Sequence, residues 1–301
     1  MKNIAIIGTG NMGAPMSVNL SEAGFTVNAY DLVTEKLDAL TPHGINKCSS
    51  HEEAIRNADI ILTMLPSGDE VKDVYYRHVS QSGDTKSLLV DSSTIDLMDA
   101  KEIHSAMKAK GFSMLDAPVS GGTIGAANGA LTFMVGGDPN DMKDASVIFD
   151  VMGKTTIHCG LGGMGQAAKM CNNMMLGIQM ASVAEGFKLA QHCGLSDEKL
   201  FDVATQSSGN CFSLTTFCPI PGIVATSPSS NGYQPGFSTE LMLKDMGLAL
   251  NAANNAGLKL QTAITAKEIY QAFSDQGNDH KDFSAIFTSL QSSLNARTGE
   301  E

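Results

Sequence analysis

The chain has 301 residues, of which 43% are hydrophobic and 17% are charged, a composition typical of a globular protein long enough for two domains. Its formal net charge of −12 argues against a nucleic-acid-binding protein, because such proteins carry a basic patch or stripe. The cysteines form no CxxC pair and the histidines are scattered, so we expect no metal site. No apolar run reaches the roughly 18 residues that span a bilayer, and no targeting peptide precedes the first strand-like run. We therefore expect a cytoplasmic protein with no membrane segment.

The first half alternates short apolar runs with amphipathic stretches. The predicted strands are Asn3–Gly8, Thr26–Asp31, Asp59–Leu65, Ser87–Ser92, Phe112–Ala117, Leu131–Gly136 and Thr155–Cys159. Helical patterns lie between several of them, for instance at Asn11–Ala23, Gly68–Arg77 and Leu97–Ala109. This alternation predicts a Rossmann-type α/β domain with a doubly wound parallel sheet.

The pattern changes after about Leu161. A segment rich in Ala, Met and Leu and without proline predicts one long interdomain helix over Met164–Cys193. Two further helices are predicted at Leu241–Asn255 and Thr262–Gln276, and the end at Gly299–Glu301 is expected to fray. The chain therefore divides into a dinucleotide-binding domain, residues 1–162, and an all-α domain for substrate binding and oligomerisation, residues 163–301.

A glycine-rich turn joins the first predicted strand to the first helix. It reads Gly8, Thr9, Gly10, Asn11, Met12, Gly13 and has the GxGxxG spacing that lets backbone approach a pyrophosphate. Asp31 ends the second strand, where an acidic residue accepts hydrogen bonds from an adenosine ribose and repels a 2′-phosphate. The pattern favours NAD over NADP, and the alternative is a glycine turn without a ligand.

Other strand ends border the same predicted crevice. Met64, Leu65 and Pro66 follow the third strand, and Thr94 lies shortly after the fourth. The alternative for Ser93 or Thr94 is an ordinary helix N-cap.

Two further segments carry candidate chemistry. Asp116 leads into a loop in which Ser120, Gly121 and Gly122 could offer a hydroxyl and backbone N–H groups to a carboxylate, although a plain turn is the alternative. Lys169 and Asn173 lie one helical turn apart on a largely apolar helix, where burial would favour an amine able to exchange protons. For this lysine, and for Lys244 farther on, the alternative is a solvated side chain.

Together these segments resemble the β-hydroxyacid dehydrogenase family, to about residue 290. GTGNMG, DAPVSGG, the GxxGxGxxxKxxxN run ending at Asn173, and Lys244-Asp245 occur in the family's order. The resemblance implies that Lys169 is the general acid/base and Asn173 its helper. It also implies that Ser120, Gly121 and Gly122 bind the substrate carboxylate, and that Leu65, Pro66, Thr94, Phe237 and Lys244 contact the cofactor.

The C-terminal half is most similar to the branch of the family that oxidises 3-hydroxyisobutyrate to methylmalonate semialdehyde in valine catabolism. The resemblance rests on Cys218–Gly222 and on Asn231–Phe237, with Gly232 and Pro235 as departures from that branch. It implies NAD as cofactor, a small β-hydroxy acid as substrate, and a homodimer or homotetramer. The alternatives are a reductase of tartronate, glyoxylate or succinic semialdehyde, and a catalytically inactive nucleotide-binding module.

Overall fold

The structure, a computed structural model, describes residues 2–291 and divides into two compact units, unit 1 (Met1–Lys169) and unit 2 (Met170–Glu301). The expectation that Gly299–Glu301 frays lies outside the described residues. Within residues 2–291, no helix combines the length and the apolar character needed to cross a membrane.

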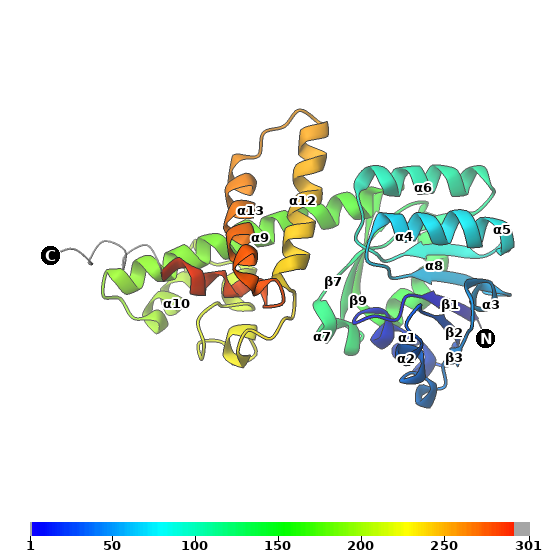
Figure 1. The fold of residues 1–301 in the computed structure, drawn as a ribbon, viewed down its shortest axis with the longest axis horizontal. Helices are drawn as coiled ribbons and strands as arrows, with labels where there is room; N and C mark the ends of the chain where they lie inside the picture. Colours follow the sequence, from blue (N-terminus) through cyan, green and yellow to red (C-terminus); the bar gives the residue numbers. More distant parts are fainter. Residues whose placement is uncertain (1, 292–301) are drawn as a thin grey trace. The chain divides into compact units, whose positions relative to one another are not determined.

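Unit 1 is built around one sheet (Figure 1). Its strands are β1 (Asn3–Ile7), β2 (Thr26–Tyr30), β3 (Asn46–Lys47), β4 (Ile60–Thr63), β5 (Leu88–Asp91), β6 (Ser113–Asp116), β7 (Val119–Ser120), β8 (Leu131–Gly136) and β9 (Gly153–Gly160). The strands in the order β3-β2-β1-β4-β5-β6 are all parallel. Successive strands are added on one side of β1 from β1 to β3 and on its other side from β4 to β6, so the strand order reverses between β1 and β4. Ligands of such sheets bind beyond the carboxyl ends of the strands at this reversal.

The helical segments of unit 1 connect successive strands. They are α1 (Gly13–Glu22), α2 (Thr34–Asp38), η1 (Thr41–His43), α3 (His51–Ile55), α4 (Gly68–Asp73), η2 (Val74–Val79), α5 (Ser80–Ser82), α6 (Leu97–Ala109), α7 (Gly122–Ala127), α8 (Pro139–Met152) and the start of α9 (Met164–His192). Several begin at a side-chain cap, for example α8 at Asp138, whose carboxylate accepts a hydrogen bond from Asn140 N.

Both faces of the sheet are covered. Along β1, Ile4 and Ile6 join the core that contains Met16 of α1 and Phe149 of α8. The alternate residues of β1 join a second core with α3, α4 and α6. The continuous apolar run of β1 is therefore the signature of a strand buried on two sides.

Unit 2 is helical. Its elements are the remainder of α9, α10 (Asp197–Thr205), α11 (Phe212–Thr215), η3 (Pro228–Asn231), α12 (Thr239–Asn255), α13 (Gln261–Phe273), η4 (Ser274–Asn278) and η5 (Phe283–Gln291). Helices α12 and α13 pack side by side (Figure 1). Their core includes Met180, Met246, Tyr270 and Phe283, all fully buried.

The predicted fold class is confirmed, with one difference in the sheet. Strand β8 runs antiparallel to β6 and β7, because the short connection from β7 through α7 to β8 does not form a parallel crossover. β8 then pairs in parallel with β9 after helix α8. The bulk of the sheet remains the predicted doubly wound, parallel arrangement.

Candidate active site

The glycines of the β1–α1 turn have three different environments. Gly8 has a φ of 94°, and a Cβ there would collide with the Met64 carbonyl at the end of β4. A Cβ at Gly13 would collide with the Gly8 carbonyl. A Cβ at Gly10, in contrast, would meet no heavy atom within 4 Å. Two glycines therefore close the turn at the reversal point, and Gly10 leaves the outer side open to a close ligand such as a pyrophosphate.

Asp31 stabilises this turn from the end of β2. Its Oδ2 accepts hydrogen bonds from Thr9 N (2.8 Å) and Thr9 Oγ1 (3.2 Å), and its Oδ1 accepts one from Val33 N (2.9 Å). Lys36 Nζ lies 3.7 Å from Oδ1. Partial burial raises the pKa of Asp31, but these hydrogen bonds and the Lys36 charge outweigh it, so the net pKa is lowered. A carboxylate thus stands beside the glycine turn, as binding of a ribose diol requires.

The strand ends of β4 and β5 are tied together by buried polar contacts. Asp91 Oδ1 accepts hydrogen bonds from Thr63 Oγ1 (2.8 Å) and Ser93 N (3.1 Å). Ser93 Oγ accepts a hydrogen bond from Leu65 N (2.9 Å). The alternative role of Ser93 or Thr94 as the cap of α6 is wrong, because Asp96 caps that helix by accepting a hydrogen bond from Met98 N (2.7 Å).

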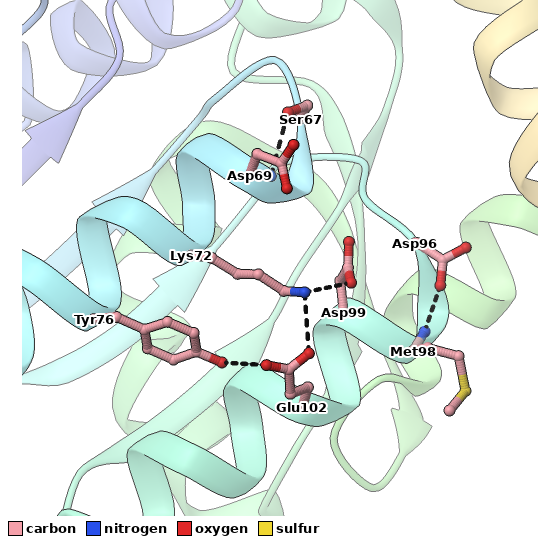
Figure 2. A network of polar contacts seen from close by, with 8 residues as sticks. All are labelled: Ser67, Asp69, Lys72, Tyr76, Asp96, Met98, Asp99 and Glu102. Carbon is pink, nitrogen blue, oxygen red and sulfur yellow. Dashed lines mark hydrogen bonds and ion pairs between the residues drawn. The ribbon is translucent and has the colours of Figure 1, made fainter.

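The helices that follow these strand ends are joined by an ion-pair network, which Figure 2 shows. Lys72 of α4 lies 2.7 Å from Asp99 and 3.0 Å from Glu102 of α6, and Glu102 accepts a hydrogen bond from Tyr76. The hydrogen bonds to Asp99 and Glu102 raise the pKa of Lys72. The network therefore links the helices that continue from the Met64–Pro66 and Ser92–Thr94 segments.

Lys169 lies beside the predicted carboxylate-binding loop. The residue is 7% exposed, and Nζ donates a hydrogen bond to Val119 O (2.7 Å). Ser120 follows directly, and Gly121 and Gly122 have φ angles of 129° and 62°. Those backbone angles favour glycine. The alternative of an ordinary solvated lysine is wrong for Lys169.

The start of α9 is held by a buried carboxylate. Asp116 Oδ1 accepts a hydrogen bond from Gly163 N (2.7 Å), and Oδ2 accepts one from Gln166 N (2.9 Å). His104 Nε2 lies 3.0 Å from the same Oδ1. Asp116 therefore caps the helix that carries Lys169, although its strand lies some fifty residues earlier in the chain.

The remaining predicted residues belong to unit 2. Asn173 Nδ2 donates a hydrogen bond to Asp245 Oδ2 (2.5 Å), next to the half-buried Lys244 on α12. Phe237 packs edge-on against Phe283, and its backbone N–H donates to Asp282 Oδ2 (3.1 Å). Gly236 N donates to the same oxygen (3.0 Å). Unit 2 therefore fixes the Asn173 amide and the Gly236–Phe237 backbone through buried carboxylates.

Of the predicted cofactor residues, those in unit 1 gather at the carboxyl ends of β1, β2, β4 and β5. They are Gly8, Gly10, Asn11, Met12, Gly13, Asp31, Met64, Leu65, Pro66 and Thr94. Sequence reasoning did not assign Gln166 or Asp282 to the site, and it quoted Asp116 only as part of a motif. Asp116 could have been found, because it ends a buried strand as Asp91 does, whereas nothing local marks Gln166 or Asp282.

Two family models cover nearly the whole chain. The NAD binding domain of 6-phosphogluconate dehydrogenase matches residues 3–162. The model described as NAD-binding of NADP-dependent 3-hydroxyisobutyrate dehydrogenase matches residues 163–290.

Individual relatives match at full length. A probable 3-hydroxyisobutyrate dehydrogenase of Mycobacterium tuberculosis is 44% identical over 296 residues, which is 98% of this chain and 100% of the relative. The NAD-dependent L-serine dehydrogenase of Pseudomonas aeruginosa is 39% identical over 292 residues, 95% of this chain and 97% of that enzyme. The solved structure of the Mycobacterium tuberculosis 3-hydroxyisobutyrate dehydrogenase with L-serine is similar with a TM-score of 0.93 and 44% identity, covering 97% of this chain and 99% of that one.

The glycine turn, the acidic end of β2 and the matching NAD-binding models define an NAD-dependent oxidoreductase with a Rossmann-type domain. The full-length relatives narrow this class. The chain belongs to the β-hydroxyacid dehydrogenase family, as its motifs predicted.

Proposed function

We propose that the chain oxidises 3-hydroxyisobutyrate to methylmalonate semialdehyde with NAD, a step of valine breakdown. The observation that carries the proposal is the 2.7 Å hydrogen bond from Lys169 Nζ to Val119 O. It places an amine next to Ser120, Gly121 and Gly122, the segment proposed to bind the substrate carboxylate. In a β-hydroxy acid the hydroxyl lies two carbons from the carboxyl carbon, so one small molecule can reach both groups.

In the proposed reaction, Ser120 and the adjoining backbone N–H groups hold the carboxylate. Lys169 accepts the proton of the primary hydroxyl as the carbinol carbon is oxidised to an aldehyde. NAD, when bound, supplies the chemistry by accepting the hydride from that carbon. Asn173, whose amide is oriented by Asp245, assists the proton transfer in this proposal. In the reverse direction Lys169 returns the proton to the aldehyde oxygen.

The geometry beside Gly10 and Asp31 supports NAD rather than NADP. Asp31 keeps its negative charge, because its pKa is lowered, and it lies beside the turn that would hold the pyrophosphate. A 2′-phosphate at this position would be repelled by the carboxylate. In this proposal Asn11, Met12 and the Met64–Pro66 and Thr94 segments complete the cofactor site of unit 1.

The main competing substrate is L-serine, which carries an ammonium group where 3-hydroxyisobutyrate carries a methyl group. A relative of this chain is named for L-serine oxidation, and a solved relative holds L-serine. Relatives named 3-hydroxyisobutyrate dehydrogenase include the mouse enzyme, 39% identical over 290 residues. The relatives named 3-hydroxyisobutyrate dehydrogenase, 44% identical in Mycobacterium tuberculosis and 39% identical in mouse, are at least as similar to this chain as the L-serine dehydrogenase, and this supports 3-hydroxyisobutyrate as the proposed substrate.

The test is NADH formation at 340 nm with purified protein, NAD and a panel of 3-hydroxyisobutyrate, L-serine, D-glycerate and 4-hydroxybutyrate. We expect the highest kcat/KM with 3-hydroxyisobutyrate. A higher value with L-serine or another acid would keep the reaction type and reject this substrate. Absence of turnover in both directions, with the matching aldehydes and NADH, would reject the dehydrogenase proposal and favour a nucleotide-binding module.

We also propose that the chain forms a homodimer or homotetramer. Helix α9 exposes large apolar side chains, with Met175 55% and Leu189 64% exposed, and a second copy could cover them. Sedimentation velocity measures the assembly, and a monomer at micromolar concentration would reject this proposal.

A further inference from the structure

The side-chain amide of Gln166 is bonded at both ends to the same turn. Gln166 is 1% exposed on the first turn of α9. Its Nε2 donates a hydrogen bond to Ser93 O (2.7 Å), and its Oε1 accepts one from Ile95 N (3.2 Å). These two backbone groups flank Thr94. A single planar amide therefore fixes the backbone on both sides of Thr94.

Thr94 is the least buried residue of this turn. Ser93 and Ile95 are buried, whereas Thr94 is half-buried. The turn is also bonded to the neighbouring strand end, because Ser93 Oγ accepts a hydrogen bond from Leu65 N (2.9 Å). Gln166 thus restrains Thr94 directly and the Leu65 segment through Ser93.

Gln166 is also rigidly connected to Lys169. The two residues are three positions apart on α9, where residues at this spacing share one helix face. The Gln166 backbone is itself held, since its N–H donates to Asp116 Oδ2 (2.9 Å). The helix turn that begins at Gln166 therefore carries both the contact to Thr94 and the amine of Lys169.

We infer that Gln166 is a positioning residue that sets the distance between the cofactor segment around Thr94 and the proton-transferring amine of Lys169. The inference rests on the proposed function, in which the hydride leaves the carbinol carbon for NAD and the proton leaves the hydroxyl oxygen for Lys169. Both acceptors must then be placed correctly at the same time, and a misplacement of about 1 Å can reduce the rate by roughly a hundredfold.

The two hydrogen bonds require an amide. Gln166→Met keeps the length of the side chain and removes the donor and the acceptor together. Gln166→Glu keeps an acceptor for Ile95 N but places a carboxylate oxygen against the Ser93 carbonyl, which repels it. Ser87→Ala is a matched control, because Ser87 is also buried and donates to a backbone carbonyl (Ala58 O, 2.6 Å) at the opposite end of β5.

The experiment measures kcat, KM, the primary deuterium isotope effect with substrate labelled at the carbinol carbon, and the Kd of NADH. The chain contains no tryptophan, so the NADH emission is read without tryptophan emission in the background. We expect both Gln166 variants to lose at least tenfold in kcat and to show a larger isotope effect. The Kd of NADH should change less than threefold, and Ser87→Ala should retain the wild-type kcat.

Hydrogen–deuterium exchange of the enzyme tests the restraint independently of turnover. Peptides covering Ser92–Met98 should exchange faster in Gln166→Met than in the wild type, and should be unchanged in Ser87→Ala. Wild-type kcat with unchanged exchange in Gln166→Met would overturn the inference and leave the proposed function standing. A wild-type enzyme that turns over no hydroxy acid would overturn the proposed function, and unchanged exchange would then also overturn the restraint.

Discussion

In both unit 1 and unit 2, buried carboxylates hold candidate site residues in place. The two units differ in what brings each carboxylate to its partner. In unit 1, Asp91 and Asp116 are paired neighbours at the ends of adjacent parallel strands, β5 and β6. In unit 2, Asn173 meets Asp245 across 72 positions of sequence, and Gly236 meets Asp282 across 46. Parallel strand ends meet at one edge of a sheet by geometry, whereas helix faces meet only as their packing allows. The placement of the carboxylates in unit 1 therefore follows from a general rule of the fold, whereas the placement of those in unit 2 depends on how its helices and loops pack.

The largest expected effect comes from removing the Lys169 amine, because the proposed mechanism assigns proton transfer to this residue of unit 1. We expect Lys169→Ala to lower kcat by roughly 10²–10⁴-fold, the usual contribution of a general acid or base, with the Kd of NADH nearly unchanged. Lys199→Ala is the control, since that side chain is 72% exposed. A Lys169→Ala enzyme with more than a tenth of the wild-type kcat would remove Lys169 from the mechanism.

The next largest expected effect is on the preference for NAD over NADP. It tests whether Asp31, at the end of β2, selects the cofactor as the motif predicts. Asp31→Ser removes the carboxylate that would repel a 2′-phosphate. We expect the ratio of kcat/KM with NAD to that with NADP to fall roughly tenfold to a hundredfold, or about 1.4–2.7 kcal/mol. Asp38→Ser changes an aspartate that is 60% exposed on α2 and should leave the ratio unaltered. If Asp31→Ser and Asp38→Ser have the same ratio of kcat/KM with NAD to kcat/KM with NADP, Asp31 does not bind the ribose.

Asp282 tests the positioning assigned to unit 2. Its Oδ1 accepts hydrogen bonds from Ser284 N (3.0 Å) and Ser284 Oγ (2.7 Å), in addition to the Oδ2 contacts with Gly236 and Phe237. Asp282→Ala leaves these buried donors without their acceptor, so the free energy of unfolding should fall by about 2–4 kcal/mol. Asp282→Asn retains one acceptor oxygen and should lose less.

Urea denaturation of both variants measures the change in the free energy of unfolding. Asp275→Ala is the control, because Asp275 is an exposed aspartate seven residues earlier in the chain. Equal midpoints for Asp282→Ala and the wild type would show that this carboxylate does not hold the Gly236–Phe237 segment.

The smallest expected effect concerns a histidine stack in unit 1. His51 and His78 are stacked with ring centroids 4.0 Å apart, and His51 also contacts Tyr30, the residue before Asp31. Burial lowers the pKa of His51, and the neighbouring His78 lowers it further. The unfolded chain therefore binds a proton below about pH 6.5 that the folded chain resists, so this contribution to stability is present above that pH and is lost as the pH falls.

Tm measured between pH 7.5 and 5.5 tests this dependence. We expect His51→Gln, which cannot be protonated, to reduce the decrease in Tm on acidification by no more than about 2 °C. An identical decrease in the variant and the wild type would assign the pH dependence to other groups.

Much of unit 1 could be predicted from the sequence. Strand β8 and helix α6 have the predicted bounds, and the other predicted strands are each within a few residues of the observed ones. Predictions gave no residue range for helix α8, although Asp138 and Pro139 are an N-cap and a first-turn proline. They also missed the short strands β3 and β7, because two residues are too few to establish a period.

The sequence by itself determined the elements whose signals are local. The alternation of strand and helix, the Gly8–Gly13 turn and the acidic end of β2 each depend on neighbouring residues, so they can be recognised without knowledge of packing. Only the tertiary structure decided which buried partner each polar side chain meets. Gln166 contacts Ile95 and Ser93 from 71 and 73 residues away, and Asp116 caps α9 from 47 and 50 residues away. A buried polar group must find a hydrogen-bond partner, but which one lies within reach is set by how the strands and helices pack.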